Sequence, residues 1–413
     1  MALKETTQTR KNDMRKLICA HLALCLVFIT STGFADDWAQ WRGPKGDGIS
    51  RETGWDPASL EPKANIAWNK NVGSGHSSFA IRDGRAYTMG NENDEDMVYC
   101  LDAKTGKEIW TFSYACPKGN YSGPRSTPVL DGDNLYTLSR DGQVHCLGAD
   151  DGNLKWRRNL VKSEKLSIPK WGLASSARVA GELVLFNAGT YGIALNKDSG
   201  ETAWRSPPPQ SSYASPVVYD AGSEKRVAMF SAKSVNAVEL RSGKRLWSFP
   251  WQTRFDVNAA DPIISNGRMF ISSGYGTGGC LLDISGAEPE PVWQNKKMAN
   301  HFNSCVLIDG HLYGIDGNTG RGAVVCIEFA TGEEKWRHGR GFEGLMAADG
   351  KLILMDNKGF LRISEVTPIE YREIANAQVL TDRSAKNWTV PVLADGYIYC
   401  RNSKGEVVCV NMQ

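Results

Sequence analysis

The sequence lacks a strong excess of charge of either sign. Its 413 residues include 48 lysines and arginines against 46 aspartates and glutamates, a formal net charge of +2. We therefore do not expect a nucleic-acid-binding protein, because such proteins usually carry a strongly basic face. With 41% hydrophobic residues, the chain is also too apolar to be intrinsically disordered. These proportions indicate an ordinary folded protein.

Long hydrophobic runs are missing too, apart from a short one near the N-terminus. Residues 1–16 are basic, residues 17–29 are apolar, and Gly33–Ala35 forms a small-x-small cleavage pattern. The apolar run is shorter than the roughly 20 residues that span a bilayer. The pattern is typical of a secretory signal peptide. We expect residues 1–35 to be removed after Ala35, leaving a periplasmic or secreted protein with no transmembrane segment.

Familiar catalytic and metal-binding motifs are also absent. The chain contains no Cys-x-x-Cys, Walker A, His-Glu-x-x-His or Gly-x-Ser-x-Gly pattern, which removes the common zinc, phosphate-loop and nucleophile-elbow sites. Residues 274–279 match Gly-x-Gly-x-x-Gly, but no helix follows them, so we interpret them as a hairpin loop. The acidic residues 91–96 lack the spacing of a calcium loop. No metal site is predicted.

What the chain does contain is one motif repeated along its length. Short apolar strands bounded by glycine and aspartate lead to the pattern Asp-x-x-Thr/Ser-Gly-x-x-x-Trp, most clearly in residues 99–110. The repeat tryptophans follow one another at intervals of about 42 to 48 residues, which is room for the four strands of one propeller blade. These tryptophans are Trp68, Trp110, Trp156, Trp204, Trp247, Trp293 and Trp336.

No segment shows a sustained helical period, so the predicted fold class is all-β. Counting first strands predicts an eight-bladed β-propeller of four-stranded blades. The first strands are expected at residues 77–81, 127–130, 175–179, 215–219, 261–264, 304–307, 345–348 and 389–393. The last repeat lacks a fourth strand, which the N-terminal segment around Trp68 can supply, closing the ring and removing an exposed edge. We expect one domain over residues 65–413 after an irregular lead-in at 36–64.

These repeats resemble the PQQ-like repeat of eight-bladed propellers, whose pattern is Ala-x-Asp-x-x-Thr-Gly-x-x-x-Trp. The resemblance covers nearly all of residues 65–410, and the lead-in at 37–44 looks like the start of secreted bacterial PQQ-like propeller proteins. It implies that each repeat tryptophan docks against the matching turn of the neighbouring blade. It also implies two functional branches: quinoprotein dehydrogenases, which use PQQ with calcium, and BamB-like scaffolds of outer-membrane barrel assembly. Fold alone does not choose between them.

The loops that lead into the first strands are expected to open together on one face, around the central channel. They carry aromatic, basic and amide residues, as binding sites on a rigid scaffold do. The predicted ligand-binding rim consists of His76, Arg125, Trp171, Tyr213, Asn258, His301, Asn303, Glu343 and Trp388. Arg125 is the best single candidate for a carboxylate or phosphate partner, because it follows the rigid turn at Gly123–Pro124.

Three functions stay open. The one we favour is an exported, monomeric, non-catalytic propeller that binds a small ligand, glycan or protein through this rim. The second is a small quinoprotein that oxidises an alcohol or sugar with PQQ and calcium, although no catalytic residue can be assigned. Residue types suited to it are Trp171 or Trp388, Arg125, Asn258 and Glu343, with Asp256 or Asp261 as a base. The third is a scaffold in outer-membrane assembly, which the lack of a lipoprotein signal disfavours.

The ten cysteines belong to two groups. Cys19 and Cys25 lie in the predicted signal peptide. Most of the others stand at matching strand ends of different blades, too far apart to form disulfides, so we interpret them as small buried residues. Pairing stays open in an oxidising compartment, with Cys400 and Cys409 of one blade as the nearest candidates.

Overall fold

The computed structural model describes residues 37–208 and 211–413. The predicted signal peptide at residues 1–35 lies outside the described residues. In the described part of the chain, no helix is long and apolar enough to cross a membrane. Regular structure there is almost entirely β-strand, with one short α-helix, α2 (Leu160–Glu164). The prediction of an all-β chain is confirmed.

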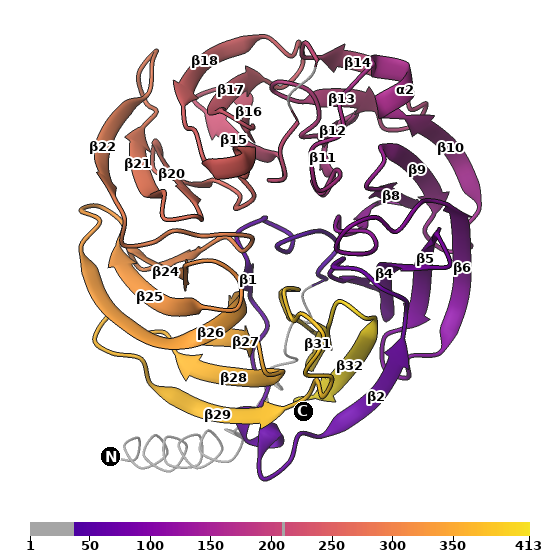
Figure 1. The fold of residues 1–413 in the computed structure, drawn as a ribbon, viewed down its shortest axis with the longest axis vertical. Helices are drawn as coiled ribbons and strands as arrows, with labels where there is room; N and C mark the ends of the chain where they lie inside the picture. The colour runs from indigo at the N-terminus through magenta and orange to yellow at the C-terminus, as the bar shows by residue number, and fades with distance from the viewer. Residues whose placement is uncertain (1–36, 209–210) are drawn as a thin grey trace, which may run out of the picture. The chain divides into compact units, whose positions relative to one another are not determined.

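The strands form successive antiparallel sheets, most of them with four strands in chain order (Figure 1). The first sheet contains β3 (Ala80–Arg82), β4 (Arg85–Glu92), β5 (Glu95–Asp102) and β6 (Glu108–Ala115). The second contains β7 (Val129–Asp131), β8 (Asn134–Leu138), β9 (Gln143–Gly148) and β10 (Leu154–Asn159). The third contains β11 (Arg178–Ala180), β12 (Leu183–Phe186), β13 (Ile193–Asn196) and β14 (Thr202–Arg205).

The next two sheets repeat this order. One contains β15 (Val217–Ala221), β16 (Glu224–Phe230), β17 (Ser234–Glu239) and β18 (Arg245–Pro250). The other contains β19 (Ile263–Ser265), β20 (Arg268–Ser273), β21 (Gly278–Asp283) and β22 (Glu290–Asn295). Each predicted first strand of these five repeats overlaps an observed strand, which begins two or three residues later because the polar residues at its start are used in contacts between sheets.

A larger sheet follows, in which one long strand serves two repeats. It contains β23 (Val306–Ile308), β24 (His311–Asp316), β25 (Gly322–Glu328), β26 (Glu334–Ala348), β27 (Lys351–Asp356), β28 (Phe360–Glu365) and β29 (Glu373–Gln378). The first half of β26 pairs with β25 and the second half with β27. The sequence predicted two separate strands here. They are continuous because Gly339 and Gly341, with φ of 64° and 89°, let the chain bend without a loop.

The C-terminal sheet includes a strand from near the N-terminus. It contains β30 (Val392–Ala394), β31 (Tyr397–Arg401), β32 (Glu406–Asn411) and β2 (Ile66–Asn71). β2 pairs antiparallel with β32, with Trp68 opposite Cys409. The two ends of the propeller segment therefore share one sheet, and the outer edge of β32 is covered.

The repeat tryptophans connect consecutive sheets. Trp110 in β6 donates from its indole Nε1 to the carbonyl of Ala149 at 3.0 Å, and its ring covers Gly152 in the same turn of the next sheet. The indole-to-carbonyl bond recurs at Trp68, Trp156, Trp204, Trp293 and Trp336. Trp247 is buried, but within the described residues its Nε1 has no partner. These indoles and the apolar clusters shared by adjacent sheets hold the blades together.

The eight cysteines of the described residues are all buried and free. Cys400 lies opposite Val408 and Cys409 lies opposite Tyr399 in the paired strands β31 and β32. Because side chains alternate along a strand, the two thiols point to opposite faces of the sheet. The nearest candidate pair from the sequence is therefore not arranged to form a disulfide.

Residues 37–56, which we call the N-terminal plug, run through the middle of the space that the sheets surround (Figure 1). The Trp38 backbone pairs with Ile81 in β3. Arg42 donates to the Cys305 carbonyl at 2.7 Å, and β1 (Ile49–Ser50) pairs in parallel with the end of β26. The plug thus contacts sheets that lie far apart in the sequence, and it occupies the middle of the fold.

Candidate functional site

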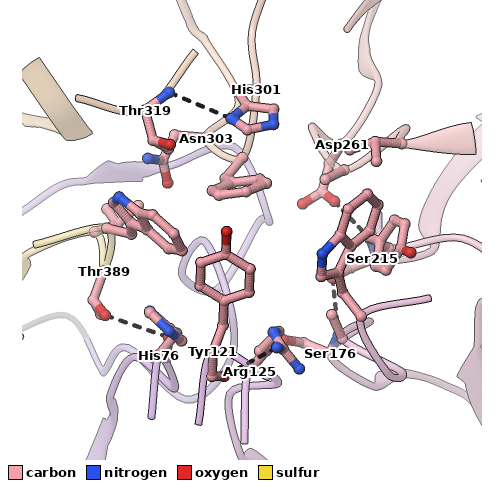
Figure 2. A pocket seen from close by; sticks show the side chains of 18 of the residues that line it. His76, Tyr121, Arg125, Ser176, Ser215, Asp261, His301, Asn303, Thr319 and Thr389 are labelled. Carbon is pink, nitrogen blue, oxygen red and sulfur yellow. Dashed lines mark hydrogen bonds between the residues drawn. The ribbon is translucent and has the colours of Figure 1, made fainter. Parts of the chain in front are cut away.

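A cavity of about 370 Å³ lies where the loops before the inner strands converge (Figure 2). Its lining comes from loops of many repeats, and residues more than 300 positions apart in the chain face the same space. Seven of the nine predicted rim residues line it: His76, Arg125, Trp171, Tyr213, His301, Asn303 and Trp388. Their role as ligand contacts stays a prediction, but they are side chains of a single cavity.

The other two predicted rim residues have different surroundings. The Asn258 side chain is fully buried, where it donates to the Ser231 carbonyl at 2.8 Å and accepts from the Ser273 hydroxyl at 2.7 Å. Glu343, in β26, lines a much smaller pocket beside the main cavity. One of its carboxyl oxygens accepts the Gly320 N–H at 2.6 Å, and burial raises the pKa of Glu343 to about 7.

Several lining residues were not among the predicted rim. The aromatic ones are Trp41, Tyr121, Tyr275 and Phe302. Phe302 stands between two predicted residues in the sequence, and Tyr121 shortly precedes Arg125, so reading whole loops would have found both. Trp41 gave no such signal, because it belongs to the plug and not to a loop of the repeat.

The plug supplies part of the cavity wall through Trp41. The indole Nε1 of Trp41 donates to one Asp261 carboxylate oxygen at 2.7 Å, and the Ser215 backbone N–H donates to the other at 2.6 Å. The Arg42 guanidinium lies 4.0 Å from the same carboxylate. Burial raises the pKa of Asp261, an effect opposed by Arg42. Asp261 is therefore engaged in holding the plug.

A belt of hydrogen bonds links the inner strands around this cavity. In each step a backbone N–H donates to the polar side chain at the matching position of the next repeat. The steps run from Ser78 to Thr127, from Thr127 to Ser176, from Ser176 to Ser215, from Ser215 to Asp261, and from Asp261 to Ser304. These bonds explain the serine, threonine and aspartate at the start of the predicted first strands, and they make a rigid base for the loops.

Aromatic rings surround the space above the belt. On one side Trp388 stacks on His76, with ring centres 5.0 Å apart, and also contacts Tyr121 and Phe302. On the other side Trp171 contacts Tyr213 and Phe255. Tyr275 and His301 connect the two sides through edge-to-face contacts. The ring faces give the cavity flat, largely apolar walls.

Among the described residues, Arg125 is the arginine of the cavity lining. Its Nη2 donates to the carbonyls of Asn120 and Tyr121 at 2.9 and 3.0 Å, which fixes the loop. Within the described residues its buried Nη1 has no partner. Burial, and then Arg140, lower the pKa of Arg125 to about 10, so it is charged at neutral pH. Among the described lining residues, the other aspartate, glutamate, lysine or arginine is Asp261, which is already paired.

The two histidines add neutral donors or acceptors. Burial lowers the pKa of His301 to about 4, and burial together with Arg125 and Arg401 lowers the pKa of His76 to about 3. His301 Nδ1 accepts the Thr319 N–H at 3.3 Å (Figure 2), so the neutral ring carries its hydrogen on Nε2. That Nε2 is buried and has no partner in the described part of the chain. Arg125 and His301 are therefore two cavity-lining residues that each have a buried nitrogen without a partner in the described residues.

Comparison with known proteins places this chain among the PQQ-like propellers. The PQQ_2 family, described as "Outer membrane protein assembly factor BamB", has a sequence model that matches residues 50–168 and 94–338, more than half of the chain. The chain belongs to this family. The outer membrane protein assembly factor BamB of Escherichia coli (strain K12) is 24% identical to this chain over 372 residues, covering 83% of this chain and 88% of that protein.

Solved structures show the same fold at lower identity. BamB from Moraxella catarrhalis matches with a TM-score of 0.63 and 14% identity, covering 84% of this chain and 99% of that one. Quinohemoprotein alcohol dehydrogenase from Comamonas testosteroni matches with a TM-score of 0.68 and 14% identity, covering 91% of this chain and 80% of that one. The prediction of a PQQ-like, distantly BamB-like propeller is confirmed.

The residues of this PQQ_2 propeller do not fit the calcium that accompanies PQQ in quinoprotein dehydrogenases. Asn258, a candidate ligand, is turned into the protein, and Asp261 is held by Trp41 and Ser215. Glu343 accepts a backbone N–H through one carboxyl oxygen in a small adjoining pocket, and its other oxygen is buried without a partner among the described residues. No group of three or more His, Cys, Asp or Glu residues that could hold a metal ion occurs in the described residues.

Proposed function

We propose that the protein is an exported binding protein whose central cavity holds an organic ligand through an anionic group on Arg125. The observation that carries this proposal is that Arg125, which lines an aromatic cavity, has a buried guanidinium nitrogen with no partner among the described residues. A buried donor without a partner costs free energy, and a charged one costs more. A carboxylate or phosphate of the ligand would supply the missing acceptor.

The architecture that we propose for this function is an eight-bladed ring. The two halves of β26 support counting the large sheet as two blades, and the β2–β32 pairing supports closure by the N-terminal strand. In such a ring the plug would block the channel from the centre. A ligand would then enter and leave only from the loop face.

Arg125 is tested with a small aromatic acid, 2-naphthoate, by calorimetry and by tryptophan fluorescence. We expect saturable binding to the wild type. Arg125→Gln, which removes the charge, is expected to weaken binding by about tenfold or more, while Arg125→Lys retains most of it. The unfolding midpoints of both variants show whether the substitution has destabilised the loop that Arg125 holds through its bonds to Asn120 and Tyr121. Equal affinity of wild type and Arg125→Gln would refute the proposal.

A scaffold role in outer-membrane assembly is a second candidate, favoured by the BamB relatives that this chain matches over most of their length. If barrel-assembly proteins copurify with this protein from the native envelope, and Arg125→Gln does not change the amount that copurifies, that role is favoured. A quinoprotein role has its own readout. Quinone absorbance and dye-linked alcohol oxidation after addition of PQQ and calcium would establish an enzyme and overturn the non-catalytic proposal.

A further inference from the structure

Each sheet of the fold ends in an outer strand that is paired along one edge. In the described residues these strands are β2, β6, β10, β14, β18, β22, β29 and the first half of β26. The free edge of such a strand presents N–H and C=O groups that can pair with another chain. Folded proteins therefore protect it with a short strand, lysine, proline or a covering segment. The outer strands differ in this protection.

Most of the outer strands are protected in one of these ways. β14 has four residues, and the short 3-10 helix η1 (Pro57–Leu60) packs against β29. The remaining ones carry basic residues or proline: Lys70 in β2, Lys155, Arg157 and Arg158 in β10, Pro250 in β18, Pro291 in β22, and Lys335 and Arg337 in β26. Proline cannot donate to a neighbouring strand, and lysine is costly to desolvate at a new sheet contact.

The outer strand β6 (Glu108–Ala115) has none of these features. It has eight residues, whereas β2, β10, β18, β22 and β29 have six each, and it contains no lysine, arginine or proline. Between Glu108 and Ala115 it is uncharged and consists mainly of β-branched and aromatic residues, which are favoured in strands. Figure 1 shows β6 on the outer circumference of the fold.

The outer edge of β6 is open to solvent. Its backbone pairs with β5 on one side, and no backbone bond to its other side is found among the described residues. The Gln143 side chain covers the end of the edge by donating to the Ala115 carbonyl at 2.9 Å. Ile109 is 45% exposed, and Ser113 is exposed as well. The edge before Ala115 is therefore accessible to another extended backbone.

The two ends of β6 differ in charge. Basic side chains outnumber acidic ones around its start, with Lys70, Lys104 and Lys107 against Asp102 and Glu108. Acidic side chains outnumber basic ones around its end, with Glu92, Asp94 and Glu95 against Lys118. Glu95 is directly opposite Ala115 in the paired strand β5. A complementary partner must therefore present an acidic end to the start of β6 and a basic end to its finish.

We propose that β6 is a docking edge for a second copy of this chain, with the two β6 strands paired antiparallel about a two-fold axis. This arrangement places the basic start of each strand beside the acidic end of the other, and the symmetry makes the two contacts equivalent. A parallel pair would bring like charges together. The protein would then be a dimer, which differs from the monomer expected from the sequence. A single strand edge makes a small interface, so the dimer should be weak.

Sedimentation velocity over protein concentrations of about 1 to 100 µM tests this proposal. We expect the average mass to rise from one chain to two, with a dissociation constant on the order of 10 µM. Ser113→Lys places on β6 the residue that protects other outer strands, and should weaken the dimer about tenfold or more. Leu154→Lys is the matched control, since Leu154 is 42% exposed on the outer strand β10, and should not change the dissociation constant. Equal unfolding midpoints of both variants and the wild type show that the fold is intact.

Charge reversal tests the orientation. Lys107→Glu should weaken the dimer, because it brings two acidic groups together at each end. Adding Glu95→Lys to Lys107→Glu should restore the dimer, since each chain then carries the reversed pair. Hydrogen exchange gives a direct readout of backbone pairing: amides of β6 should exchange more slowly at the higher protein concentration, while those of β10 should not change.

A concentration-dependent dimer that is lost in Ser113→Lys and kept in Leu154→Lys would support the proposal. A wild type that stays monomeric throughout the concentration range would overturn it, and so would a dimer that Ser113→Lys leaves unchanged. Failure of Glu95→Lys to restore the dimer of Lys107→Glu would overturn the antiparallel arrangement. If the wild type is monomeric and captures an envelope protein that Ser113→Lys does not, the edge pairs with a different chain, and the proposal of a second copy is wrong.

Discussion

Replacement of Gly152 by alanine should destabilise the protein through the ring of Trp110. Gly152 has φ of +70°, and a Cβ built on it would lie 2.6 Å from Cε3 of the indole. Ordinary carbon–carbon contacts are about 3.5–4.0 Å, so the ring would have to move by about 1 Å. It cannot move freely, because its Nε1 is bonded to Ala149 and its face packs beside Tyr87.

The expected loss in the free energy of unfolding of Gly152→Ala has two parts. Alanine in the left-handed region costs about 1–2 kcal/mol wherever it occurs. Crowding of the indole and weakening of its hydrogen bond add about 2 kcal/mol. Gly132 is the matched control, since it lies in another turn of the same sheet, has φ of +53°, and a Cβ there would meet nothing within 4 Å. Gly132→Ala should lose only the part that comes from the left-handed backbone conformation.

Guanidinium denaturation of the two variants, followed by far-ultraviolet circular dichroism, measures the difference. Gly152→Ala should lose about 2 kcal/mol more than Gly132→Ala. In a Trp110→Leu background the extra loss should largely disappear, because the clashing ring is gone. Equal losses for the two alanine variants, or an extra loss that persists without Trp110, would refute the reasoning about tryptophan docking.

Two further predictions concern buried polar groups. The Arg401 guanidinium donates to the carbonyls of Ser77 and Met89 at 3.0 and 2.6 Å, joining the C-terminal sheet to the first one. Arg401→Met should lower the free energy of unfolding by about 3 kcal/mol, measured by denaturant titration. A smaller loss in Arg401→Met than in Arg401→Lys would contradict the role of these bonds. Burial, and then Arg157, lower the pKa of His145 to about 4, so from pH 6.5 downward the unfolded chain binds a proton that the folded chain does not. The free energy of unfolding should therefore fall as the pH falls, by about 2.5 kcal/mol at pH 4.5 from His145 alone. Between pH 7.5 and 4.5, His145→Phe should lose about 2.5 kcal/mol less than the wild type. If the free energy of unfolding of the two proteins changes in parallel with pH, His145 is not the group responsible.

Local patterns were sufficient for the repeat. The pattern Asp-x-x-Thr/Ser-Gly-x-x-x-Trp is contained within each repeat, so the sequence alone predicted an all-β chain and its strands. The resemblance to the PQQ-like repeat implied that the tryptophans dock between sheets. The sequence could not show that β26 is continuous, because that depends on the φ angles of Gly339 and Gly341 and on pairing with strands on both sides.

Side-chain direction also lay beyond the sequence. Asn258 and His301 occupy equivalent loops, yet the first is turned into the protein by three carbonyl acceptors and the second lines the cavity. Which way an amide points depends on acceptors supplied by other segments, and no periodic pattern records them.

The sequence by itself determined the repeated unit, because hydrophobic alternation, turn residues and the tryptophan recur along the chain at intervals of about 42 to 48 residues. Only the tertiary structure decided the site. Trp41 reaches the cavity from the N-terminal plug, which has no periodic pattern. Arg125 has a buried nitrogen without a partner in the described residues, and Tyr275 contacts Phe255 from a different loop. These relations arise from contacts between distant segments, and such contacts form only when the sheets pack around their centre.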